Sequence, residues 1–106
     1  MEGIMVKKRL QMILTTDEIS RLKISDTEKG NVNITVDVHG MKCSQAKRFI
    51  NNIINAAHTA VQLVIIHGYN HGTAIKDMLA DNFKNAHITT QYQDPFNQGI
   101  THMSIA

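Results

Sequence analysis

Residues 61–73 read VQLVIIHGYNHGT. Their first part, 61–66, is a short apolar run rich in β-branched residues, which is typical of a central strand in a covered sheet. The run ends abruptly in a loop that contains two histidines and two glycines. After the loop, an apolar stripe recurs at helical spacing, carried by Ile75, Met78, Leu79 and Phe83. The stretch therefore predicts a strand, a loop and a helix near 73–85.

A second unit of the same kind precedes this one. Residues 33–39, NITVDVH, alternate between apolar and polar side chains, as a half-buried strand does. Gly40 then allows a turn, and Ser44 is a good helix N-cap. The positions that follow carry apolar side chains at i, i+3, i+4, i+7, i+8 and i+11, namely Ala46, Phe49, Ile50, Ile53, Ile54 and Ala57. We therefore predict an amphipathic helix near 44–58.

Two further strands are predicted at 87–92 and 100–105, joined by the loop 94–99. The order is then β-α-β-α-β-β, and the two βα units should give parallel strands with right-handed crossovers. Two helices cannot cover both faces of a sheet. The expected fold class is therefore α/β (α+β): a two-layer sandwich in which a four-stranded mixed sheet carries two helices on one face. The strand at 61–67 should not lie at a sheet edge.

Residues 1–31 differ from the rest of the chain. They are charged and mixed in pattern, and they close on the turn-rich stretch 26–31, DTEKGN. Thr15 and Glu18 have capping-box spacing, which indicates a short helix over about 16–23. We expect residues 1–31 to be an N-terminal extension or arm, and residues 32–106 to be the domain.

The composition suits one small globular domain. The chain has 106 residues, 42% of them hydrophobic, and a net charge of +2 from 11 basic and 9 acidic side chains. That balance permits nucleic-acid binding without requiring it. The single cysteine, Cys43, excludes an intrachain disulfide and is either an inert thiol or a nucleophile. With no apolar run long enough to cross a membrane, we expect a soluble cytoplasmic protein without a membrane partner.

Chemically capable residues gather where the two parallel strands should end. Ligands in open α/β sheets bind beyond the carboxyl ends of such strands, so Asp37, His39 and Gly40 should lie near the loop 67–73. Asp37 and His39 are two apart on a strand and project to the same face. A carboxylate beside an imidazole suits general acid–base catalysis, although a simple surface pair has the same sequence. His67 is either catalytic or a structural hydrogen-bonding residue.

The glycines of the loop indicate anion binding. Gly68 and Gly72 can adopt a positive φ, and the helix that begins after them offers free N–H groups and a favourable dipole to a phosphate. An ordinary tight turn would need the same residues. A metal site formed by His67, His71 and either His39 or Asp37 is conceivable, but a flexible loop aligns such ligands poorly. The remaining histidines fit no cluster in the sequence.

These motifs resemble those of the Smr (small MutS-related) domain. The resemblance is carried by Val-Asp-Val-His-Gly at 36–40, by His67-Gly68 followed by Gly72-Thr73, and by Asn-Gln-Gly-Ile-Thr at 97–101. It covers residues 33–106 and identifies 32–106 as an Smr-like domain. It implies a fold similar to the C-terminal domain of bacterial translation initiation factor three. At Asn70 the sequence departs from the family motif, which has glycine there.

The resemblance also implies function. It predicts a nucleic-acid-binding domain and an endonuclease that nicks DNA or cleaves RNA, with Asp37, His39 and His67 as catalytic residues. The expected contacts with phosphate or nucleic acid are Gly40, Gly68, Tyr69, Asn70, Gly72, Thr73, Lys42, Lys47, Arg48 and Lys76. Structured DNA or RNA is the expected substrate, a ribosome or repair complex a conceivable partner, and Mg²⁺ or Mn²⁺ a conceivable cofactor. The alternative is a module that binds structured nucleic acid or a ribosome-associated partner without cutting. The oligomeric state is left open.

Overall fold

A computed structural model describes residues 2–69 and 72–106. Its elements are, in chain order, α1 (Glu2–Gln11), α2 (Thr16–Ser20), β1 (Leu22–Asp26), β2 (Val32–Asp37), α3 (Cys43–Ala57), β3 (Val61–Ile66), α4 (Ala74–Asp81), β4 (Ile88–Gln93) and β5 (Ile100–Ile105). From residue 32 onward, the predicted β-α-β-α-β-β order is confirmed. The N-cap of α3 is Lys42, so Ser44 lies inside the helix.

The sheet has five strands, so the predicted four-stranded sheet is wrong. The strand order is β1-β2-β3-β5-β4, with β2 and β3 parallel and the other pairs antiparallel. The additional strand is β1, which pairs with β2 from Leu22 opposite Val36 to Asp26 opposite Val32. The predicted turn at 26–31 is the hairpin loop between them. As predicted, β3 lies in the middle of the sheet.

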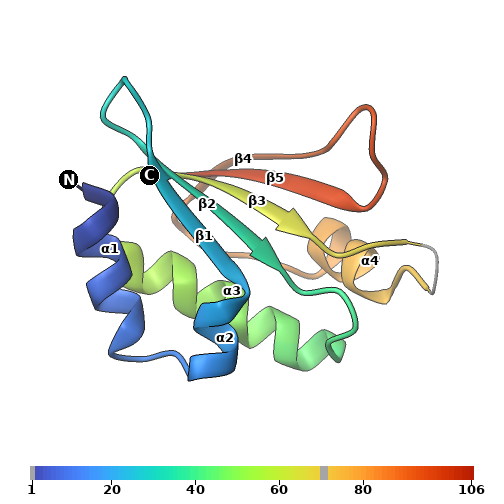
Figure 1. Cartoon of the computed structure of the whole chain (residues 1–106). Coiled ribbons are helices and arrows are strands. Elements are labelled where there is room, and N and C mark those ends of the chain that lie inside the picture. The colour runs from blue at the N-terminus through green and yellow to red at the C-terminus, as the bar shows by residue number, and fades with distance from the viewer. Residues whose placement is uncertain (1, 70–71) are drawn as a thin grey trace.

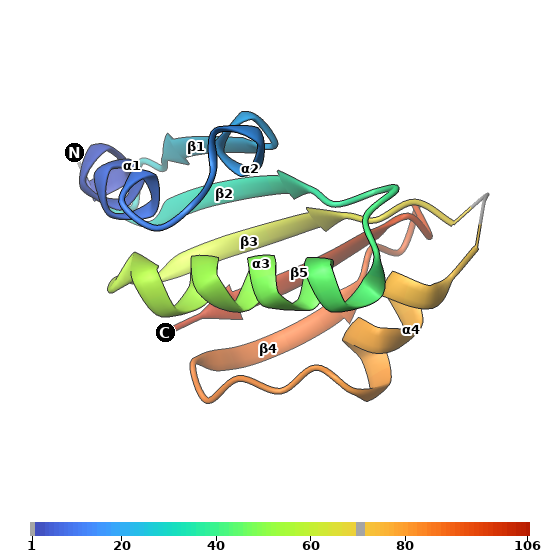
Figure 2. The same cartoon turned by 90° about the horizontal axis from the view of Figure 1, so that it is seen from below.

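All helices of the described residues lie on one face of this sheet (Figures 1 and 2). The prediction of one covered face is therefore confirmed. The predicted number of two helices is wrong, because α1 and α2 join α3 and α4 on that face. None of these helices is long and apolar enough to cross a membrane.

The core lies between α3 and alternate residues of the strands. The predicted apolar stripe of α3 is buried along its whole length, with Phe49 and Ile50 fully buried. Residues paired in the ladder project to the same face, so Ile34 of β2 and Leu63 of β3 meet this stripe together. The same alternation leaves every second strand residue on a face that carries no described helix.

The first part of the chain shares this core. Val6 and Leu10 of α1 are fully buried, and Arg9 donates a hydrogen bond to the carbonyl of Ala57 at the end of α3 (2.7 Å). The predicted capping box at Thr15 and Glu18 is present, with the Thr15 hydroxyl accepting from the Glu18 amide at 3.1 Å. The segment expected as an extension thus supplies an edge strand and two helices to the same globule.

Candidate functional site

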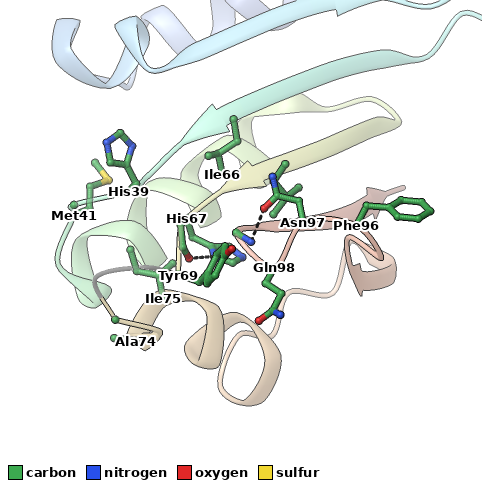
Figure 3. A pocket seen from close by; sticks show the side chains of 15 residues that line it. His39, Met41, Ile66, His67, Tyr69, Ala74, Ile75, Phe96, Asn97 and Gln98 are labelled. Carbon is green, nitrogen blue, oxygen red and sulfur yellow. Dashed lines mark hydrogen bonds between the residues drawn. The ribbon is translucent and has the colours of Figure 1, made fainter.

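A pocket lies where the loops after β2 and β3 meet the loop before β5 and the start of α4 (Figure 3). Its volume is about 930 Å³. The sequence predicted that the two strand ends would be neighbours, and their loops do line one wall together. The lining residues are His39, Gly40, Met41, Ile66, His67, Gly68, Tyr69, Gly72, Ala74, Ile75, Phe96, Asn97, Gln98, Gly99 and Ile100.

Asp37 and His39 form the predicted pair. Nδ1 of the His39 ring bonds to Oδ1 of Asp37, and the same oxygen accepts from the His39 amide at 3.1 Å. Partial burial raises the pKa of Asp37, but the bonds from the His39 ring and amide and the charges of His39 and Arg21 outweigh it. The pKa therefore lies below its ordinary value of 3.8. The His39 side chain is 67% exposed.

The fixed Nδ1 directs the other nitrogen of His39 away from the carboxylate. Within the described residues, no hydrogen bond is made by Nε2 of this ring. An imidazole held at one nitrogen and open at the other can exchange a proton with a molecule in the pocket. The pair thus has the arrangement that acid–base catalysis requires.

Arg21 supports this strand end from the N-terminal segment. Its carbonyl accepts from the Asp37 amide (3.0 Å), and its guanidinium donates back to the Asp37 carbonyl (3.2 Å). The Asp37 backbone is thereby held beside the residue that directly precedes β1. Arg21 was not among the predicted site residues, and its role depends on the pairing of β1 with β2, which the sequence did not reveal.

His67 lines the pocket, but the residue is almost fully buried. Only 6% of the residue is exposed, and both ring nitrogens are engaged. Nδ1 lies 2.8 Å from the carbonyl of Gly68, and Nε2 lies 2.9 Å from the hydroxyl of Thr101. A carbonyl only accepts, so Nδ1 must donate, and a neutral ring then accepts the Thr101 hydroxyl proton at Nε2. This geometry matches the structural hydrogen-bonding role that the sequence left open.

The glycines adopt the backbone conformations predicted for them. φ is +80° at Gly40, +72° at Gly68 and +122° at Gly72. The amide of Gly68 bonds to the carbonyl of Gly99 (3.1 Å), so it is not free to hold a phosphate. A Cβ at Gly99 would lie 3.1 Å from Cα of Gly68, which shows how closely these two loops pack.

The start of α4 retains its predicted potential for an anion. The first amides of a helix have no partner within the helix, and α4 begins at Ala74, beside the pocket. The Thr73 hydroxyl donates to Oδ2 of Asp77 at 2.8 Å, so it is already engaged. Asn70 and His71, part of the predicted phosphate loop and of the conceivable metal site, lie outside the described residues.

The predicted basic residues do not line the pocket. Lys42, Lys47 and Arg48 are exposed at the start of α3, and Lys76 is half-buried on α4. In the two described parts of the chain, no group of three or more His, Cys, Asp or Glu side chains could hold a metal ion. Cys43 is half-buried, and its thiol lies 3.6 Å from the Ala74 carbonyl.

A second Asp–His pair was missed in the sequence. His102 of β5 bonds through Nε2 to Oδ2 of Asp94 (2.7 Å), and its ring stacks on Tyr92 of β4, with centroids 4.8 Å apart. Asp94 also accepts the amides of Phe96 and Asn97. The bonds from His102 and these amides lower the pKa of Asp94 below 3.8. The sequence contained a signal for this pair, because the predicted hairpin of the last two strands brings Asp94 and His102 together.

The chain matches no family model, no curated protein and no solved structure. The resemblance to the Smr domain therefore rests on the sequence motifs alone.

Proposed function

We propose that this chain is an Smr-like, nucleic-acid-binding domain that cleaves a phosphodiester bond, with Asp37 and His39 as its acid–base pair. The observation that carries the proposal is the Asp37–His39 bond at the mouth of the pocket, which leaves the exposed ring open at Nε2. The β-α-β-α-β-β order of residues 32–106 supports the likeness to the Smr domain and to the C-terminal domain of initiation factor three.

In the proposed reaction, His39 removes a proton from the attacking oxygen. In hydrolysis the attacking oxygen belongs to water, and in RNA it can belong to the neighbouring 2′-hydroxyl group. The negative Asp37 carboxylate holds the ring in the tautomer with hydrogen on Nδ1, and it stabilises the imidazolium that forms. The proton then returns from His39 to the leaving oxygen or to solvent, and the ring regains its starting state.

The scissile phosphate would lie in the pocket between His39 and the first turn of α4. The unbonded amides of that turn favour a negative group, in agreement with the predicted anion site. His67 is a positioning residue in this proposal, because its two hydrogen bonds connect the end of β3 to β5 and to the glycine loop. The basic residues of α3 would contact more distant phosphates.

The second candidate is a module that binds nucleic acid without cutting it. Two observations favour this reading. The engaged His67 ring leaves His39 as the one exposed histidine among the described residues that line the pocket. Asn70 also stands where the family motif has glycine. A binding module would use the same pocket to hold a phosphate and would keep the Asp37–His39 pair as a surface contact.

Incubation with nucleic acid distinguishes the two candidates. Purified protein is mixed with supercoiled plasmid, structured RNA and an unpaired oligonucleotide, each with chelator, with Mg²⁺ and with Mn²⁺. We expect cleavage of at least one substrate, and the chelator arm shows whether a divalent ion takes part. Binding without cleavage under every condition would leave the binding module as the function. Absence of both binding and cleavage would overturn the proposal.

A further inference from the structure

The five aromatic residues of the chain divide into two groups. Phe49 and Phe83 fill the core, with 0% and 6% of their surface exposed. The other three are Tyr69, Tyr92 and Phe96, and they are exposed to 45%, 56% and 97%. Burying a Phe side chain stabilises a fold, and Phe96, which is exposed, gains almost none of this stabilisation. These three rings are therefore available to a ligand.

The exposed rings lie at or beside the candidate site. Tyr69 and Phe96 line the pocket that also contains His39, and in Figure 3 the Phe96 ring points away from the other labelled side chains. Tyr92 stands on β4, in the hairpin whose loop carries Phe96. Figure 1 shows this loop rising on the side of the sheet that carries no described helix.

The Tyr92 ring is held in a fixed orientation. It stacks on His102 with an angle of 17° between the ring planes, and Asp94 fixes the His102 ring through the bond at Nε2. The other oxygen of Asp94 accepts the amide of Phe96 at 2.9 Å, so one carboxylate fixes the Tyr92 ring through His102 and also holds the backbone of Phe96. A flat ring that is ordered before binding costs little entropy when a ligand stacks on it.

The strand register connects this cluster to the acid–base pair. Tyr92 lies opposite His102, His102 opposite Val64, and Val64 opposite Thr35, two residues before Asp37 on β2. Paired residues project to one face, so all of these side chains occupy the helix-free face, and Asp37 shares it. A strand of nucleic acid can therefore cross from the Tyr92 ring toward His39 without leaving this face.

The charges of the face decide what kind of nucleic acid it fits. Among the strand residues of the described chain, Lys23 is the one cation on this face, while Asp37 and Asp94 are both bonded to histidines. A duplex presents its phosphates and is held by several Lys and Arg contacts. An unpaired strand presents flat bases, which stack on aromatic rings whatever their sequence.

We propose that Tyr92, Phe96 and Tyr69 form a stacking surface for unpaired nucleobases, which leads a single strand to the Asp37–His39 pair. The inference rests on the proposed function, since it names the substrate class of that same site. The ligand is single-stranded DNA or RNA, or an unpaired segment of a longer structure. Stacking on the Tyr92 and Phe96 rings supplies affinity, and the pocket receives the phosphate to be cut.

Binding is measured by fluorescence anisotropy, with a labelled single strand of about 12 nucleotides and with the matching duplex. The protein carries His39→Ala, so that cleavage does not disturb the titration. We expect Tyr92→Ala and Phe96→Ala each to weaken single-strand binding by about 5- to 150-fold. Tyr92→Phe and Phe96→Tyr keep the rings and should retain affinity. Met12→Ala removes another exposed apolar side chain, far from the pocket in sequence, and serves as the matched control.

Each outcome separates the two proposals. If neither nucleic acid binds, the proposed function fails together with this inference. If the single strand binds and the two alanine variants bind equally well, the stacking surface alone is overturned. Duplex binding as tight as single-strand binding would also contradict it, as would equal losses in Tyr92→Phe and Tyr92→Ala. Thermal melts of each variant by circular dichroism confirm that the exposed substitutions leave the fold intact.

Discussion

The described part of the molecule contains two Asp–His pairs that differ in exposure and in the ring nitrogen that is bonded. The Asp37–His39 pair lies at the end of β2, and its two side chains are 39% and 67% exposed. The Asp94–His102 pair lies on β5 and the loop beside it, with side chains exposed to 22% and 26%. The first bonds through Nδ1 and leaves Nε2 open, whereas the second bonds through Nε2 and packs its ring against Tyr92.

The difference shows what an Asp–His pair needs for chemistry. Both carboxyls have a pKa lowered below 3.8, so both are charged at neutral pH. What separates the pairs is access, because only His39 presents an open ring nitrogen beside a pocket. The Asp94 carboxylate instead satisfies two loop amides and one ring, which makes it a structural group.

The largest expected effect comes from removing the charge of Asp37, with the same change at Asp94 as the comparison. Asp37→Asn should lower the rate of cleavage by about 10²–10⁴-fold, since a displaced or wrongly protonated His39 cannot transfer the proton. Asp94→Asn should leave the single-turnover rate far less affected, because its histidine does not face the scissile bond. The measurement is the rate with labelled substrate at saturating protein.

The double variant Asp37→Asn/His39→Ala sharpens this test. Residues that act as one unit are not additive, so its rate should be little lower than that of either single variant. Losses that multiply would mean that the two side chains act separately. An unchanged rate in Asp37→Asn would remove this carboxylate from the mechanism.

The second prediction concerns the buried histidine, His67. Thr101→Val removes the hydroxyl that satisfies Nε2 and leaves a buried polar atom without a partner, which costs about 1–3 kcal/mol of unfolding free energy. Thr101→Ser keeps the hydroxyl and is the matched control. Urea denaturation, monitored by circular dichroism, measures the unfolding free energy of both variants. Equal stability of Thr101→Val and the wild type would show that this bond does not hold the ring.

The third prediction uses acid. Because the folded-state pKa of Asp94 is lowered, the carboxylate adds stability above pH 3.8, and this contribution is lost as the pH falls through the folded value. The Asp94→Asn variant has no carboxylate to protonate at this position, so it has no such contribution to lose. Between about pH 5 and about pH 2 the wild type should therefore lose more unfolding free energy than the variant. If the unfolding free energies of the wild type and of Asp94→Asn fell in parallel with pH, the bond to His102 would contribute no stability.

The smallest effect is expected from the exposed basic side chains of α3. Lys47→Ala with Arg48→Ala removes two exposed cations on α3 and should weaken binding about equally for all sequences. If each contacts a phosphate, the salt slope falls by about 0.7 per lost contact with a single strand, and by about 0.9 with duplex DNA. Lys7→Ala with Lys8→Ala on α1 is the matched control. A salt slope equal to that of the wild type would mean that Lys47 and Arg48 are only a solvated helix face.

The sequence predicted the central elements because their patterns are strong. The apolar stripe of α3 and the alternation of β2 each admit one interpretation, and the β3 strand is flanked by clear turn residues. The Asp37–His39 pair was predicted from a spacing of two on a strand. In the structure β2 ends at Asp37 and His39 lies in the turn after it, where its amide and its ring both bond to the carboxylate. The positive φ values at Gly68 and Gly72 followed from residue type.

The features that the sequence did not predict depend on contacts between distant segments. Strand β1 is short, with the sequence LKISD, and only its pairing with β2 makes it a strand. Exposed Ile4 and Met5 obscure the stripe of α1, which buries Val6 and Leu10. The Asp94–His102 bond depends on the register of a hairpin that contains an irregularity between residues 88 and 90.

The burial of His67 is a different case, because a signal was present. Counting in steps of two from Val61 passes through Leu63 and Ile65 to His67, and this is the face that meets the helices. The prediction treated the strand as covered on both sides, so the alternation was not used. The alternation of side chains between the two faces of a strand would by itself have favoured the structural role of this histidine over the catalytic one.

The most direct test of the central claim is the single-turnover cleavage rate of His39→Ala beside that of His87→Ala. His87 is an exposed histidine at the opposite end of β4 from the pocket loop. The account predicts that His39→Ala binds nucleic acid with near-normal affinity and cuts about 10²–10⁴-fold more slowly, while His87→Ala cuts at the wild-type rate. A His39→Ala protein that cuts as fast as the wild type would contradict the account.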